Sequence, residues 1–156
     1  MSENEAVGEQ VGPGGGLVDV DSGEFAGWQM WQSDAFEQRA GPFYERIDDD
    51  RRPVVAFRAE PRHMNGAGFM HGGCLMTFAD SAIFTIAREA LAGSHGVTMS
   101  MTSDFLDAAR TGDLIEARGE VTRAGGKTIY ARGIVTANGK PVLSFTGIIR
   151  KVSPRG

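Results

Sequence analysis

The chain has 156 residues, of which 41% are hydrophobic and 23% charged, which is typical of one globular domain and excludes collagen-like, mucin-like and wholly disordered chains. The 16 basic and 20 acidic residues give a net charge of -4 without a long basic run, which argues against a nucleic-acid partner. The one cysteine excludes an intrachain disulfide and a CxxC-type zinc site. Without a secretory signal or a membrane-spanning apolar run, the protein is expected to be cytoplasmic.

The N-terminal segment differs in composition from the remainder of the chain. Residues 1–23 are acidic and rich in glycine, with few side chains to bury, and they are predicted to form a flexible tail. Residues 24–153 are predicted to form a single domain. At its start, the spacing of Trp28, Trp31 and Phe36 is typical of one face of a short helix, which the intervening Ser-Asp pair could divide into two pieces.

Two short strands are predicted after this helix, which is expected to stop at Gly41-Pro42. The strands cover residues 43–47 and 54–58, and a charged turn at 48–53 joins them. The turn contains three adjacent aspartates. A solvated hairpin turn explains these aspartates better than a metal site, because aspartate bonds its own backbone in turns.

The best helical pattern follows a loop at residues 60–73 that is rich in glycine and proline. From Leu75 to Leu91, apolar residues repeat at intervals of three and four, and the other faces of the helix also carry apolar side chains. Such a helix is expected to be buried, and Gly93 is a plausible end for it.

The last third of the chain is predicted to form four long strands. They cover residues 96–107, 113–122, 128–137 and 141–152, with a strong hairpin signal at Asn138-Gly139. Because the connections are short, the strands are expected to pair antiparallel in sequence order. The result is an α+β architecture, in which a five- or six-stranded antiparallel sheet packs on one long helix. One helix cannot cover that sheet, so its flanks or edges are expected to meet another subunit.

Two glycines open the predicted buried helix. Gly72 and Gly73 lie where the first backbone amides lack acceptors within the helix and where the helix dipole is positive. Without a Cβ, a ligand can approach these amides closely. The position suits either a carbonyl oxygen that gains negative charge during acyl transfer or a phosphate group.

A carboxylate lies inside the same apolar helix. Burying Asp80 costs free energy unless it has partners, which predicts either an ion pair with a residue such as Arg88 or a role as base or nucleophile. Gly72 and Asp80 are eight residues apart, and eight residues of helix rise about 12 Å, which an aspartate side chain cannot span. If both act on one carbonyl, Asp80 must come from a second chain in a two-fold dimer.

The motif formed by Asn65, His71-Gly72-Gly73 and Asp80, followed by Gly96-Val97-Thr98, resembles a known family. It is similar to the phenylacetate-pathway (PaaI-like) type of hotdog-fold acyl-CoA thioesterases, in the 4-hydroxybenzoyl-CoA thioesterase superfamily. The resemblance spans roughly residues 36–152. It implies a hotdog fold, in which a curved antiparallel sheet wraps a long helix, and a homodimer that assembles into a homotetramer.

The resemblance also implies roles for individual residues. Gly72 supplies an amide that polarises the thioester carbonyl, and Asp80 of the partner chain activates water or attacks the carbonyl itself. Asn65 orients the nucleophile or the aspartate, and His71 holds the loop or assists near the thioester. Thr98 falls where relatives carry a hydroxyl near the attacking water.

Four further residues are assigned to binding acyl-CoA. Gly73 adjoins the carbonyl site, and the turn that contains Arg123, Gly126 and Lys127 is the candidate site for the nucleotide phosphates, although a plain hairpin turn with solvated charges explains it as well. No cofactor and no metal is expected. Cys74 could pair with His71 as a nucleophile, but a buried helical cysteine is the better interpretation.

The resulting hypothesis is hydrolysis of an acyl-CoA thioester to a free acid and CoA. Two alternatives remain open: a hotdog module that binds acyl-CoA without cleaving it, and a hotdog enoyl-CoA hydratase. The hydratase branch usually carries its Asp and His before the helix, whereas here Asp80 lies within it. The acyl group and the tetramer arrangement stay undefined.

Overall fold

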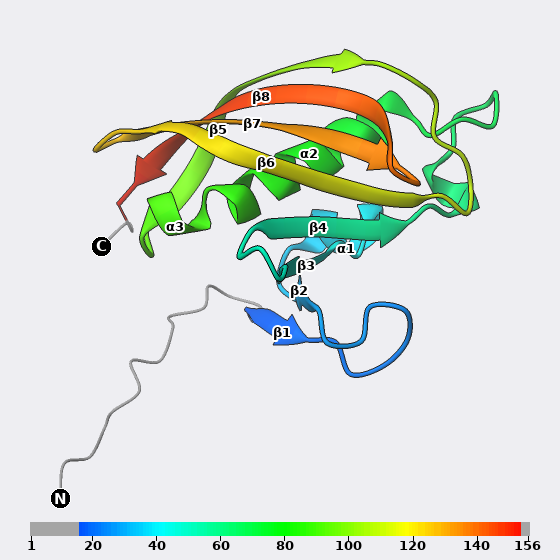
Figure 1. Ribbon diagram of the computed structural model, residues 1–156, viewed down its shortest axis with the longest axis horizontal. Helices are drawn as coiled ribbons and strands as arrows, with labels where there is room; N and C mark the ends of the chain where they lie inside the picture. The colour runs from blue at the N-terminus through cyan, green and yellow to red at the C-terminus, as the bar shows by residue number, and fades with distance from the viewer. Residues whose placement is uncertain (1–15, 154–156) are drawn as a thin grey trace, which may run out of the picture.

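One antiparallel sheet wraps around a long helix in the computed structural model, which describes residues 16–153 (Figure 1). The elements in chain order are β1 (Leu17–Asp19), β2 (Gln29–Trp31), α1 (Ala35–Ala40), β3 (Tyr44–Ile47), β4 (Pro53–Arg58), the 3-10 helix η1 (Pro61–His63), α2 (Gly72–Ile86), α3 (Arg88–Leu91), β5 (His95–Phe105), β6 (Leu114–Ala124), β7 (Thr128–Ala137) and β8 (Lys140–Val152). The strand order across the sheet is β1-β2-β3-β4-β6-β7-β8-β5. The predicted α+β class with one central helix is therefore confirmed.

The sheet has eight strands rather than the five or six predicted, because two strands of three residues each extend it beyond β3. Strand β1 lies within the segment 1–23 that was predicted to be a flexible tail, so ordered structure begins by Leu17. The part of that prediction on residues 1–15 lies outside the described residues. Three residues are too few to produce a periodic signal in the sequence.

The predicted helix around Trp28 and Trp31 is wrong, because Trp31 ends strand β2. The division at Ser-Asp is correct: Asp34 caps α1 by accepting the N–H of Glu37 at 2.9 Å, and the helix ends at Gly41. The capping Asp34 lies between Trp31 and Phe36, so it separates the strand from the helix. The spacing of the aromatic residues alone did not reveal this boundary.

The pairing of the long strands follows the sequence order only in part. Strands β6, β7 and β8 are consecutive neighbours, and the β7–β8 turn at Asn138 and Gly139 has positive φ angles of 49° and 84°, as its hairpin signal predicts. Strand β5, however, pairs with β8 and not with β6. Residues 106–113 form a connection long enough to cross two strands, so adjacency in sequence does not fix adjacency in space here.

The central helix is divided near its end and packs closely on the sheet. Ala87 separates α2 from α3, so the apolar run to Leu91 forms two helices rather than one. On β6, a Cβ at Gly119 would lie 2.2 Å from the carbonyl oxygen of Arg132 and 2.8 Å from Cδ1 of Ile86. The absence of a side chain at that position lets α2 approach the sheet.

A β-bulge between Thr98 and Ser100 interrupts strand β5. On one side of the bulge, Thr98 faces α2; on the other, the inward residues are Met101, Ser103 and Phe105. The extra residue thus changes which alternate positions face the helix. Strict alternation from Thr98 would instead have turned Ser103 and Phe105 away from α2.

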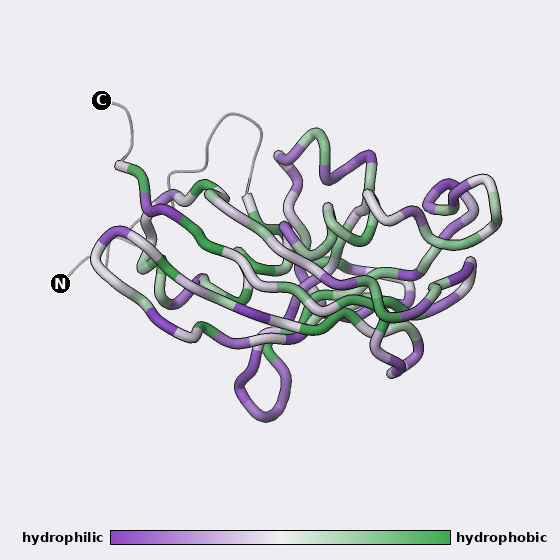
Figure 2. Tube along the Cα trace, turned by 90° about the horizontal axis from the view of Figure 1, so that it is seen from above, coloured by the Kyte–Doolittle hydropathy of each residue, from purple (hydrophilic) through white to green (hydrophobic). Residues whose placement is uncertain are grey.

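Hydrophilic residues gather in several projecting loops, while hydrophobic and hydrophilic residues are mixed along the strands (Figure 2). The core combines α2 side chains such as Phe78 and Ile83 with sheet residues such as Phe57 and Ile149, all of them buried. Within residues 16–153, no helix has the length and apolar character needed to cross a membrane.

Candidate active site

The first half of the candidate site is the N-terminus of α2. His71 is the N-cap, and its Nδ1 accepts the N–H of Gly73 at 2.8 Å. The N–H of Gly72 has no acceptor among the described residues. A Cβ at Gly72 would lie 3.2 Å from the ring of Phe105 on β5, so a larger residue would crowd this end of the helix. We call Asn65, His71, Gly72 and Gly73 the amide half-site.

Asn65 shapes the loop that leads into this helix end. Its Oδ1 accepts the N–H groups of Ala67 and Phe69 at 2.9 and 3.1 Å, and its own N–H bonds the carbonyl of Phe69 at 2.7 Å. The oxygen of the side chain is therefore committed to the loop. The side-chain nitrogen Nδ2 of Asn65 has no partner among the described residues and remains able to donate a hydrogen bond to a ligand.

The second half of the site lies further along α2 and combines Asp80 with Thr98. The Thr98 hydroxyl donates to Oδ1 of the half-buried Asp80 at 2.6 Å. The alternative ion pair between Asp80 and Arg88 is not formed, because Arg88 pairs with Glu45. Asp80 therefore has a hydroxyl partner and no cationic partner among the described residues. We call Asp80 and Thr98 the carboxylate half-site.

The two half-sites lie at different levels of the same protomer. Both are on α2, and eight residues of helix separate Gly72 from Asp80 by about 12 Å. Strand β5 runs antiparallel to α2, since Gly72 adjoins Phe105 and Asp80 bonds Thr98. One chain alone therefore does not bring the helix amide and the carboxylate onto one carbonyl group.

The predicted phosphate-binding residues belong to the β6–β7 hairpin. Thr98 pairs with Ile149, which pairs with Ile129, so the carboxylate half-site is level with the start of β7. Lys127 lies two residues before Ile129, at the tip of the hairpin, and Arg123 pairs with Tyr130 on its flank. Arg123, Gly126 and Lys127 therefore lie near the carboxylate half-site and not near the amide half-site.

A groove of about 520 Å³ lies between α1 and the first turns of α2. It is lined by Phe36, Arg39, Ala40, Arg62, His63, Met64, His71, Gly73, Cys74 and Thr77. Two of its titratable groups are held uncharged: burial raises the pKa of the Cys74 thiol to about 11 and lowers the pKa of His63. Cys74 is thus a poor nucleophile near neutral pH.

The sequence analysis missed a buried carboxyl group behind this groove. Glu37 on α1 is 9% exposed and accepts the hydroxyl of Ser81 on α2 at 2.9 Å. Burial raises the pKa of Glu37 to about 7. No local signal could have found it, because a glutamate in the first turn of a short helix is usually solvated.

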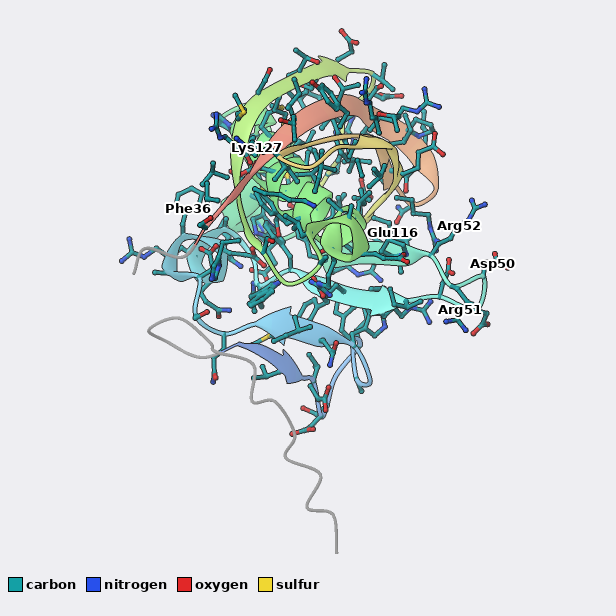
Figure 3. All side chains as sticks on the ribbon, turned by 90° about the vertical axis from the view of Figure 1, so that its left-hand side faces the viewer. Phe36, Asp50, Arg51, Arg52, Glu116 and Lys127 are labelled. Carbon is teal, nitrogen blue, oxygen red and sulfur yellow. The ribbon has the colours of Figure 1, made fainter. Side chains whose placement is uncertain are left out.

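A larger hollow of about 880 Å³ lies on the outer face of the sheet, beside the β3–β4 turn. Figure 3 shows this turn, labelled at Asp50 and Arg52, projecting from the side opposite Phe36 of the α1–α2 groove. The charged side chains of this hollow include the ion pairs of Arg118 with Asp48 and Arg132 with Glu120. It holds no residue of either half-site.

Comparison with known proteins places the chain in a family. Residues 67–143 match the model of the Thioesterase superfamily. The chain is 31% identical over 120 residues to a Pseudomonas aeruginosa protein provisionally named an esterase, covering 76% of the chain and 90% of that protein. It is 31% identical over 125 residues to the acyl-coenzyme A thioesterase PaaI of Escherichia coli, covering 77% of the chain and 87% of that enzyme. Its structure matches the TT0310 protein of Thermus thermophilus with a TM-score of 0.66 and 28% identity, covering 76% of the chain and 98% of that protein.

Proposed function

Because the chain belongs to the thioesterase superfamily and has the hotdog fold, we propose that it hydrolyses an acyl-CoA thioester to a free carboxylic acid and CoA. The hydrogen bond from Thr98 to Asp80 is the observation that carries the proposal, because it orients a carboxylate that no described cation neutralises. Such a carboxylate can act as a general base or as a nucleophile.

The reaction needs both half-sites. The Gly72 N–H, at the positive end of α2, would donate to the carbonyl oxygen of the thioester and stabilise the negative charge that develops there. Asp80 of the partner chain would take a proton from water as the water oxygen attacks the carbonyl carbon, or would attack that carbon itself. The C–S bond then breaks, and the CoA sulfur leaves as a thiolate that takes up a proton. After attack by water, the acyl group leaves as the free acid; after attack by Asp80, the acyl group forms a mixed anhydride with the carboxylate, and water hydrolyses that anhydride to the free acid and Asp80.

A two-fold dimer would join the half-sites. Strand β5 ends the sheet and exposes 48% of Val97, 57% of Met99 and 56% of Phe105, although these are large apolar side chains. Such an edge is suited to antiparallel pairing with its own copy. The two α2 helices would then run antiparallel, each Asp80 facing the other chain's Gly72.

The same dimer suggests where CoA binds. Since the β6–β7 hairpin is level with the carboxylate half-site, its Arg123 and Lys127 would lie beside the composite site. Their charges would attract the phosphates of the nucleotide. The assembly of two such dimers into a tetramer is part of the proposal.

The test compares Asp80→Asn with the matched control Asp49→Asn in the exposed β3–β4 turn. With a panel of acyl-CoA substrates and detection of free thiol, Asp80→Asn should lower kcat by at least about 10²-fold and Asp49→Asn should not change it. Both variants should elute as wild type in size-exclusion chromatography. Full turnover by Asp80→Asn on every thioester would refute the assignment. Tight binding without thiol release would favour the binding module, and loss of enoyl absorbance without thiol release would favour the hydratase.

A further inference from the structure

Two buried glutamates accept hydrogen bonds from hydroxyl groups that lie one turn apart on α2. Among the described residues, only one of these glutamates forms an ion pair. Glu45 is 4% exposed, accepts the Thr85 hydroxyl at 2.6 Å and pairs with Arg88. Glu37 is 9% exposed and accepts the Ser81 hydroxyl at 2.9 Å, without a cationic partner among the described residues. Glu45 is therefore buried beside an opposite charge, whereas Glu37 is buried with a hydroxyl group as its hydrogen-bond donor.

The surroundings of Glu37 disfavour its charged form. The carboxylates of Asp34, at the start of α1, and of Glu45, on β3, act on it unfavourably, and α2 contributes only the Ser81 hydroxyl. Arg88 on α3 neutralises Glu45 and not Glu37. Burial is the main cause that raises the pKa of Glu37 to about 7, and the two acids add to it, so the group gains or loses its proton near neutral pH.

The Glu37–Ser81 contact is one of few that hold α1 in place. This helix has six residues, too few to be stable alone. Its other hydrogen bonds to the described residues outside α1 and its caps join Gln38 to the carbonyl of Trp31, Arg62 to the carbonyls of Arg39 and Gly41, and the His63 ring to the carbonyl of Ala40. Three α1 residues line the α1–α2 groove: Phe36, Arg39 and Ala40. The position of α1 therefore determines the width of the groove.

We propose that Glu37 is a positioning residue, which holds α1 against α2 while it is protonated and loosens α1 when it ionises. The groove is then closed at low pH and opens as the pH rises. Since the pKa of Glu37 is raised in the closed state, closure is fully stable below the ordinary pKa of a glutamate, weakens as the pH rises to about 7, and does not change further above that. In so far as the groove receives the acyl group, this inference rests on the proposed function.

Hydrogen exchange of the full-length chain tests the inference without reference to catalysis. The probes are the α1 amides of Gln38 and Gly41, which bond the carbonyls of Asp34 and Glu37. Dividing wild-type exchange rates by those of Glu37→Gln at the same pH removes the intrinsic dependence on hydroxide. This ratio should rise roughly tenfold between pH 6 and pH 8. A ratio that is constant with pH would overturn the proposal.

Two further variants test whether the pH transition comes from ionisation of Glu37 or only from a change in packing. Ser81→Ala removes the one hydrogen bond that favours the ionised carboxylate, so the midpoint of the transition should move to higher pH. Glu89→Gln, at an exposed position on α3, should retain the wild-type midpoint. If Ser81→Ala leaves the midpoint unchanged, Glu37 is not the titrating group.

A kinetic readout links the contact to the substrate. The quantity is the ratio of kcat/KM for octanoyl-CoA to that for acetyl-CoA between pH 5.5 and 8.5, in which any pH dependence that the two substrates share cancels. Because the groove opens as the pH rises, it should accept the longer acyl chain better, so the ratio should rise with a midpoint near pH 7 in the wild type and stay constant in Glu37→Gln. The same midpoint in both proteins would overturn the proposal. If no thioester is cleaved but the exchange result holds, the proposed function fails and the role of Glu37 stands.

Discussion

The two ends of α2 are built for different purposes. At the N-terminal end, two glycines follow an exposed histidine cap, and the Gly72 amide has no acceptor among the described residues. At the C-terminal end, Ile83 and Ile86 are buried against glycines of the sheet, and the hydroxyl of Thr85 bonds the buried Glu45. The end with the unsatisfied amide carries the amide half-site of the proposed chemistry, and the closely packed end anchors the helix.

This difference separates activity from stability along a single helix. Groups that must bind a substrate cannot also be saturated by the protein, so an open helix end contributes little to folding. The packed end must then hold the helix in register with β5, on which the Asp80–Thr98 contact depends. Substitutions at the two ends should therefore affect different measured quantities.

The largest effect is expected at the packed end, from Gly119→Ala. The new Cβ would meet a backbone oxygen at 2.2 Å, which side-chain rotation cannot relieve. We expect a loss of about 3 kcal/mol in the free energy of unfolding, measured by urea denaturation. Gly126→Ala, whose Cβ would meet no atom within 4 Å, is the matched control. Equal stability of the two variants would contradict the close packing of β7 and of Ile86 around Gly119.

The carboxylate half-site should show the opposite behaviour. Thr98→Val keeps the shape of the side chain but removes the donor to Asp80, so thioester hydrolysis should fall roughly 10- to 100-fold while the melting temperature is retained. Thr102→Val, on the same strand, removes a hydroxyl that bonds Thr146 and should leave kcat unchanged. A similar loss of activity in both variants would argue that the strand, and not the hydroxyl, is what matters.

A smaller effect on stability is expected from Arg88→Gln, which leaves the buried Glu45 without its cation. Because the Arg88 side chain is 44% exposed, solvent screens part of the interaction, and we expect a loss of about 1–2 kcal/mol in thermal unfolding. The control is Arg132→Gln, which breaks an exposed pair with Glu120. That control should cost less than about 0.5 kcal/mol; a larger loss than in Arg88→Gln would contradict the importance of burial.

The smallest effect is expected at the open end. His71→Ala removes the acceptor of the Gly73 N–H, and loss of a helix cap costs about 1 kcal/mol or less. Differential scanning calorimetry should show a decrease of roughly 2–4 °C. The exposed His95 serves as the control, and His95→Ala should melt as wild type. A decrease as large as that of Gly119→Ala would show that both ends anchor the helix equally.

Local patterns predicted much of the fold. The long apolar repeat identified α2, and the Asn138-Gly139 signal identified the β7–β8 turn. The Thr98 side chain faces α2. Met101, Ser103 and Phe105 also face inward, and strict alternation from Thr98 would turn them outward, so the β-bulge after Thr98 is needed. Bulges have no reliable local signature, so the sequence could not indicate this change of face.

Contacts between distant segments could not be predicted. The pairing of β5 with β8 depends on how the chain crosses the sheet, and the burial of Glu37 depends on where α1 rests on α2. The separation of the half-sites was predictable, since it follows from helical rise alone. Their meeting across two chains remains a prediction.

The two margins of the sheet are unequal, with 11 residues in β5 and three in β1. If two copies join through β5, the merged sheet ends on both sides in β1, which offers too short a template to recruit another strand. Edge-to-edge pairing of the described sheet would then stop at the dimer and would not continue into fibrils. The long edge strand β5 would serve to form a closed dimer.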